Sequence, residues 1–123
     1  MFRIDQDKTV HLTRGDIAGI DITAKMSDGT NYAFIVGDVV RLKIFEKKDC
    51  QCVVLQKDVT VTEETTSVEI ALDGTDTKIG DLINKPKDYW YEVELNPDTA
   101  PQTIIGYDDN PKIFRLYPEG KDM

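Results

Sequence analysis

The clearest extended segment of this chain is Tyr89-Trp90-Tyr91-Glu92-Val93-Glu94-Leu95. Successive side chains of a β-strand point to opposite faces of its sheet, so residues two apart share a face. Tyr89, Tyr91, Val93 and Leu95 alternate here with Trp90 and two glutamates. This period of two predicts a strand whose tyrosine side enters a core and whose other side faces outward.

The same alternation, or a short apolar run, recurs along most of the chain. These segments are 20–26, 40–45, 53–55, 59–61, 68–72, 103–105 and 113–117. Twelve Thr, twelve Ile and ten Val supply β-branched side chains, which suit a strand better than a helix. Turn residues separate the segments at intervals of about 8–12 residues. We therefore expect an all-β fold, an immunoglobulin-like antiparallel β-sandwich of about seven to nine strands, with an open barrel or jelly roll as the alternative.

One short helical turn is expected near residues 77–83, because Asp76 or Thr77 can cap it and Pro86 would stop it. A chain of 123 residues is long enough for one packed core, so we expect a single domain over 1–123 with a frayed tail at 118–123. No apolar run approaches the roughly 18 residues that span a bilayer, and the first residues lack the apolar segment of a secretory signal.

The charge of the chain is strongly acidic. Fifteen Lys and Arg residues against twenty-three Asp and Glu residues leave a net charge of −8, with a pI near 4.5. Such a surface repels phosphate backbones and anionic lipids, so we expect neither a nucleic-acid partner nor a membrane partner.

The residues that most often carry catalysis or metals are sparse. His11 is the single histidine, and its alternation with Val10 and Leu12 predicts a solvated ring on the outer face of a strand. Cys50 and Cys52 are two residues apart, where a mutual disulfide would be strained, so we expect two reduced thiols at the start of a strand. The alternative is a reactive or metal-binding pair, although His11 is the one other soft ligand available.

Two acidic clusters offer oxygen ligands to a hard cation. They are Asp73-Gly74-Thr75-Asp76 and Asp108-Asp109-Asn110. Neither has the spacing of a dedicated calcium loop, and the same residue types are what turns require, so we interpret both as turns. Because nucleophile-elbow and phosphate-loop motifs are also missing from the sequence, we expect no enzyme, no metal and no cofactor.

The order of the segments resembles a known family. The matching segments are Leu12-Thr13-Arg14-Gly15-Asp16, 20–24, Asp28-Gly29-Thr30, 37–42, 71–77, 89–95, 103–105 and 113–116. Together they resemble the N-terminal immunoglobulin-like domain of phage baseplate upper proteins and related fibre-attachment proteins, over residues 9–117. One departure is the segment 85–88, which stands where the family usually has a glycine before the Tyr-rich strand.

The resemblance implies a non-enzymatic phage or prophage virion structural protein, a baseplate, tail or head-fibre module that acts through protein–protein contacts. Its partners would be copies of itself or other phage structural subunits, with a homo-oligomer in the particle. The implied location is the virion, after synthesis in the bacterial cytoplasm. Because the chain stops near Met123, where baseplate proteins often continue into a fibre region, we expect a stand-alone adaptor or small fibre subunit.

The residue pattern suggests where such a contact lies. If the tyrosines of 89–95 face the core, Trp90 faces outward between Glu92 and Glu94 and makes a plausible interface anchor. The alternative places Trp90 in a secondary core under the loop 77–86.

A second function remains open, a carbohydrate- or peptide-binding β-sandwich module. Clustering of Tyr32, Trp90 and Tyr107 on one face would favour it, because aromatic rings stack on sugars. Residues 14–16 also spell Arg-Gly-Asp, which we interpret as a tight turn at Gly15 rather than as an adhesion motif.

Overall fold

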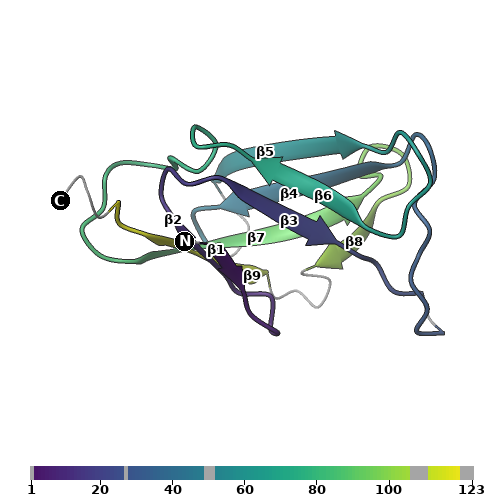
Figure 1. The fold of residues 1–123 in the computed structure, drawn as a ribbon, viewed down its shortest axis with the longest axis horizontal. Coiled ribbons are helices and arrows are strands. Elements are labelled where there is room, and N and C mark those ends of the chain that lie inside the picture. Colours follow the sequence, from purple (N-terminus) through teal and green to yellow (C-terminus); the bar gives the residue numbers. More distant parts are fainter. Residues whose placement is uncertain (1, 27, 49–51, 106–110, 120–123) are drawn as a thin grey trace.

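A computed structural model describes residues 2–26, 28–48, 52–105 and 111–119 (Figure 1). These residues form nine strands and no helix, which confirms the expected all-β class. The strands are β1 (Phe2–Ile4), β2 (Val10–Thr13), β3 (Ala18–Ile22), β4 (Val39–Phe45), β5 (Val53–Thr60), β6 (Val68–Leu72), β7 (Lys87–Leu95), β8 (Gln102–Ile105) and β9 (Lys112–Tyr117). No helix of the described residues is long and apolar enough to cross a membrane.

The larger of the two sheets has the order β1-β2-β9-β7-β4-β5, with β8 also paired to β7. Its pairs are antiparallel except β2 and β9, which run parallel. The expected antiparallel pairing therefore holds for every described strand pair except this one. Parallel neighbours need a long connection, and nearly the whole chain separates β2 from β9.

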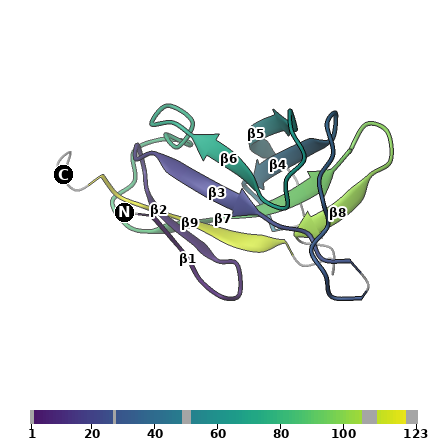
Figure 2. The ribbon, with the colours of Figure 1, turned by 45° about the vertical axis from the view of Figure 1, so that its right-hand side comes forward.

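The smaller sheet consists of β3 and β6, which form a second layer over the larger sheet (Figures 1 and 2). Both sheets contribute to one core, as the period of two predicts. Ile20 and Ile70 enter it from the smaller sheet, while Leu42, Tyr91 and Phe114 enter it from the larger one. This arrangement is consistent with a β-sandwich, and its immunoglobulin-like character stays a prediction.

The expected helical turn at 77–83 is wrong. The chain makes one turn, in which the Thr77 amide donates to the carbonyl of Asp73 (3.2 Å), and then leaves helical geometry. Gly80 has a φ of +67°, and the guanidinium of Arg14 donates to the carbonyls of Ile79 (3.3 Å) and Gly80 (2.7 Å). These carbonyls accept hydrogen bonds from Arg14, which directly follows β2, in place of the backbone amides of a helix.

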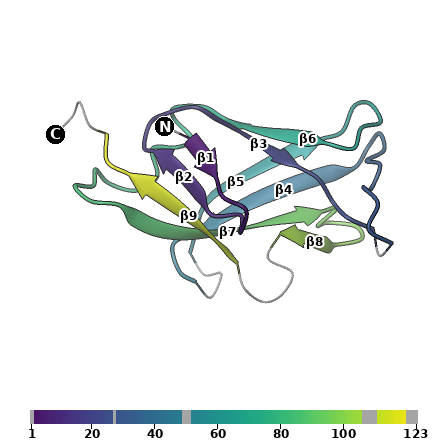
Figure 3. The same cartoon turned by 60° about the horizontal axis from the view of Figure 1, so that its bottom comes forward.

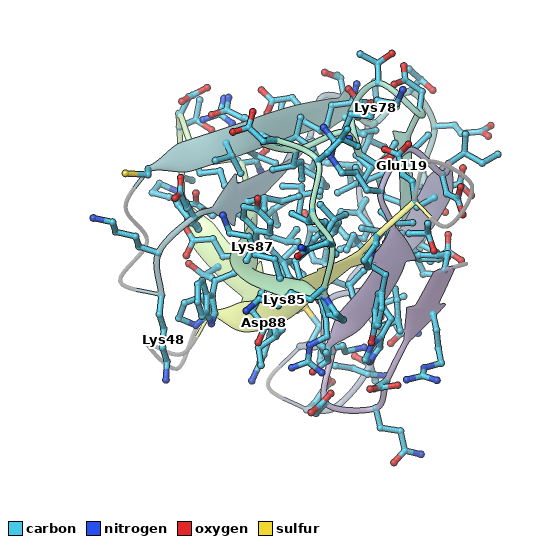
Figure 4. All side chains as sticks on the ribbon, turned by 90° about the vertical axis from the view of Figure 1, so that its left-hand side faces the viewer. Lys48, Lys78, Lys85, Lys87, Asp88 and Glu119 are labelled. Carbon is cyan, nitrogen blue, oxygen red and sulfur yellow. The ribbon has the colours of Figure 1, made fainter. Side chains whose placement is uncertain are left out.

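Part of the expected frayed tail is held in place. Glu119 accepts a hydrogen bond from Arg14 at 2.8 Å, and the two side chains are 10% and 9% exposed. Figure 4 shows Glu119 near Lys78. The remaining residues of that tail, 120–123, lie outside the described part of the chain.

Candidate functional site

A groove of about 570 Å³ opens between β8 and the free edge of β3, and we name it the β8 groove. Its apolar lining consists of Ala24, Met26, Tyr32, Leu95, Ile104 and Ile105. Its polar lining consists of Lys8, Asp21, Thr23, Lys25, Gln102 and Thr103. Concave surfaces that combine apolar side chains with polar groups are typical of binding sites, and here six lining residues are of each kind.

The strand order explains why the groove exists. One edge of β7 carries two strands in succession, β9 beside residues 87–91 and β8 beside residues 93–95. On the far side of β9 the sheet continues with β2, which begins at Val10 and does not extend beside β8. Among the described strands β8 therefore pairs with β7 alone, and β3 pairs with β6 alone. In the described part of the chain, no strand lies beside the outer edge of β8 at the β8 groove.

The two ends of the groove come from different elements. In Figures 1 and 3 the turn that joins β1 to β2 lies to the left of β8, and the chain that follows β3 extends to its right. Lys8 belongs to that turn and Lys25 to the segment after β3, so the two lysines of the lining come from segments on opposite sides of β8. The Nζ of Lys25 donates to Oδ1 of Asn31 at 2.6 Å. Asp21 is the one carboxylate of the lining residues.

One wall of the groove is preorganised by a buried carboxylate. Asp38, 5% exposed, accepts hydrogen bonds from the Tyr32 hydroxyl (2.9 Å), the Ile35 amide (3.0 Å) and the Asn96 side chain (3.1 Å). Burial by itself raises the pKa of Asp38, but these hydrogen bonds outweigh it and hold the pKa below its ordinary value. The Tyr32 ring also packs edge-on against Phe34 at 5.1 Å. Tyr32 therefore lines the groove from a fixed position.

The free edges of the larger sheet are not equally protected. An edge strand usually carries a charge, or is very short, so that other chains do not pair with it. The edge strand β1 is protected because it has three residues and includes the charged Arg3. The edge strand β5 is protected by Lys57, which faces inward and forms an ion pair with Asp76 at 3.0 Å. The four residues of β8 carry no charge, and its one irregularity is the register shift opposite Val93 and Glu94. Its edge is the least protected of the three.

The predicted interface residues lie elsewhere, on the outer face of the larger sheet. Tyr89, Tyr91, Val93 and Leu95 are buried and Trp90, Glu92 and Glu94 are half-buried, so the predicted alternation is confirmed. Trp90 pairs in register with Phe45 of β4 and Ile113 of β9. The loop 77–86 contributes Ile79 to the main core, and the alternative of Trp90 in a secondary core under that loop stays a prediction.

The two glutamates of this face are balanced by a neighbouring lysine. Lys43 of β4 lies 3.4 Å from a carboxylate oxygen of Glu94 and is the register partner of Glu92. Burial raises the pKa of Glu92, nearby Glu94 raises it further, and Lys43 opposes both effects. Opposite charges on neighbouring strands stabilise a sheet, so this arrangement has a sufficient structural role. A docking role for Trp90, Glu92 and Glu94 stays a prediction.

The expectation that His11 is solvated is wrong. The side chain is 7% exposed, with Nδ1 at 2.7 Å from the Tyr117 hydroxyl and Nε2 at 2.8 Å from Asp5. The hydrogen bond to His11 lowers the pKa of Asp5. The outward side of β2 is covered because Asp5, which follows β1, and Tyr117 of β9 both contact the imidazole ring of His11. His11 thereby links three neighbouring strands.

The Arg-Gly-Asp sequence is a structural turn, as expected. Arg14 is 8% exposed, and Gly15 has a φ of +89° that favours glycine. The Gly15 amide donates to the Thr77 hydroxyl at 3.0 Å, and that hydroxyl donates to the carbonyl of Asp16 at 2.7 Å. These contacts join the end of β2 to the loop between β6 and β7.

The remaining candidate ligands do not gather. No group of three or more His, Cys, Asp or Glu side chains that could hold a metal ion occurs among the described residues. The carboxylate of Asp73 accepts a hydrogen bond from the Asp76 amide (2.8 Å), and the carboxylate of Asp76 accepts one from the Asp73 amide (3.1 Å). This is the expected turn. Cys52 is exposed, whereas Cys50 and the cluster 108–110 lie outside the described residues.

Comparisons with protein-family models, with curated proteins and with solved structures find no match for this chain.

Proposed function

We propose that this chain is a non-enzymatic structural module of a phage or prophage particle, which acts by protein–protein contact through the β8 groove. The observation that carries the contact is the uncharged outer edge of β8, beside which no described strand pairs. Strand addition to a free sheet edge is a common mode of protein recognition, in which backbone hydrogen bonds supply affinity. The particle setting comes from the family resemblance of residues 9–117.

The groove favours a peptide over a carbohydrate. Stacking on a sugar would need exposed aromatic faces in one place, but Trp90 lies on the outer face of the larger sheet, away from the core side that Tyr32 packs against. The Tyr32 hydroxyl is occupied by Asp38, and Tyr107 lies outside the described residues. Of the alternative binding functions, the peptide-binding one therefore has support from the geometry.

The test is incorporation into particles. The variant Thr103→Lys places a charge on the free edge of β8, and Thr60→Lys places the same charge on another exposed threonine of an edge strand, β5. We expect the wild-type chain and Thr60→Lys to be detected by mass spectrometry in purified particles and Thr103→Lys to be strongly depleted. Absence of the wild-type chain from particles, or equal incorporation of both variants while all three chains are folded, would contradict the proposal.

A further inference from the structure

We infer that the β8 groove binds an extended peptide strand that has apolar side chains in its middle and a carboxylate toward each end. This inference rests on the proposed function and names the class of partner segment. It is drawn from three features of the groove: its length, its apolar floor and the placement of its charges.

The length comes from the free edge. At about 3.3 Å per residue, the four residues of β8 present an edge of roughly 13 Å. A strand laid beside them would take the row of the sheet that β2 occupies next to β9. At the same rise per residue, a segment of ~5–7 residues would cover this edge and extend to both ends of the groove.

The apolar floor of the groove determines which side chains suit the middle of the bound segment. Leu95 is 5% exposed and belongs to the main core, and Ile104 and Ile105 pack against that core from β8. Ala24 and Tyr32 approach from the other side. Alternate side chains of an added strand point toward such a floor, so valine- or isoleucine-sized residues at every second position would be removed from water.

The charged side chains of the lining determine which residues suit the two ends of the bound segment. Lys8 and Lys25 come from segments on opposite sides of β8 and outnumber the one carboxylate of the lining, Asp21, so the lining carries a positive excess. The chain as a whole carries −8, which repels an acidic peptide at long range. In the β8 groove an acidic strand meets a lining with the opposite sign of charge.

The same geometry disfavours a second copy of β8 as the occupant. A two-fold contact between identical edges needs a self-complementary surface. The edge of β8 is recessed beside β3 and the segment after it, and two copies would bring the same positive lining residues together. A donated, separate strand fits this shape better.

Fluorescence anisotropy with three labelled heptapeptides tests the inference on the full chain. The acidic probe is Glu-Val-Thr-Val-Thr-Val-Glu with blocked termini, the basic probe replaces both Glu with Lys, and the third replaces the middle Val of the acidic probe with Pro. We expect the acidic probe to bind about tenfold more tightly than the basic one, because two exposed ion pairs are exchanged for repulsions. The proline probe should lose most of its affinity, because it lacks a backbone N–H.

Two charge reversals locate the binding. Lys8→Glu should weaken binding of the acidic probe and strengthen binding of the basic probe. Lys85→Glu, at the end of the molecule shown in Figure 4, should change the affinity of neither probe. Equal binding of the acidic and basic probes, no detectable binding of the acidic probe, or equal effects of the two reversals would overturn the inference. These results would leave the proposed function standing if Thr103→Lys still prevents incorporation into particles.

Discussion

At the scale of single residues, two buried polar side chains, Asp38 and Arg14, join distant parts of the chain. Asp38 follows Gly37 in a turn, yet it is almost fully buried and is joined to Asn96 and Tyr32. Arg14 and Glu119 form a largely buried pair across 105 positions of sequence. Buried polar groups of this kind are costly to leave unpaired, so each of them constrains the packing around it.

The variant Asp38→Ala should lower the free energy of unfolding by about 1–3 kcal/mol, because it leaves the partly buried donors of Tyr32 and Asn96 without their acceptor. Urea denaturation measures the change. Asp81→Ala, which removes an exposed carboxylate, is the matched control and should stay within about 0.5 kcal/mol of wild type. Equal stability of the two variants would show that the Asp38 contacts contribute little.

The same carboxylate predicts a pH dependence. The pKa of Asp38 is lowered in the folded state below its ordinary 3.8, so folding favours the ionised form. Its stabilisation is complete above pH 3.8 and is lost as the pH falls through the lower folded value. The difference in unfolding free energy between wild type and Asp38→Asn should therefore narrow below pH 3.8, and a constant difference would argue against this assignment.

At the scale of elements, protection of strand edges distinguishes β5 from β8. Both are edge strands of the larger sheet over at least part of their length, and both have exposed residues. In β5 the amine of Lys57 points toward the inner side of the sheet and is held by Asp76. An incoming strand at that edge would have to accommodate this charge, whereas no such charge stands on β8.

Replacing that protecting charge should create a new contact. Lys57→Val leaves eight residues of β5 with an apolar inner side, so we expect concentration-dependent association that wild type does not show in the same range. Sedimentation velocity measures it. The control is Lys47→Val, which removes the same charge from the turn between β4 and β5; if both variants behave alike, loss of charge rather than the edge is responsible.

At the scale of the whole molecule, one core joins the two sheets. Its buried residues come from every described strand except the edge strands β1, β5 and β8. A domain of 123 residues can be stabilised by such a core without a disulfide or a metal.

The melting temperature should accordingly be insensitive to chelators and to thiol reduction. We expect EDTA or dithiothreitol to shift it by less than about 2 °C, which corresponds to roughly 0.5 kcal/mol for a domain of this size. Differential scanning calorimetry with each reagent separately is the measurement. A drop of several degrees with EDTA would indicate a bound metal, and a drop with dithiothreitol would indicate a disulfide through Cys50 or Cys52.

Much of the fold could be predicted because a strand's alternation is local. The period of two in 89–95 places Tyr89 and Tyr91 inside and Trp90 outside whatever strands lie beside it. The turn at Gly15 likewise follows from a residue that tolerates positive φ. The expected helical turn failed because Arg14, more than 60 positions earlier, occupies the carbonyls it would use.

The candidate site depends instead on which strands become neighbours. Nothing within 102–105 indicates that its outer edge is free, since this follows from β2 pairing with β9 and ending before it reaches β8. His11 is buried for the same kind of reason, because Tyr117 lies 106 positions away in sequence and 2.7 Å away in space. Side-chain periodicity is encoded residue by residue, but free edges and buried polar contacts arise when distant segments meet, and those meetings are set by the packing of the whole core.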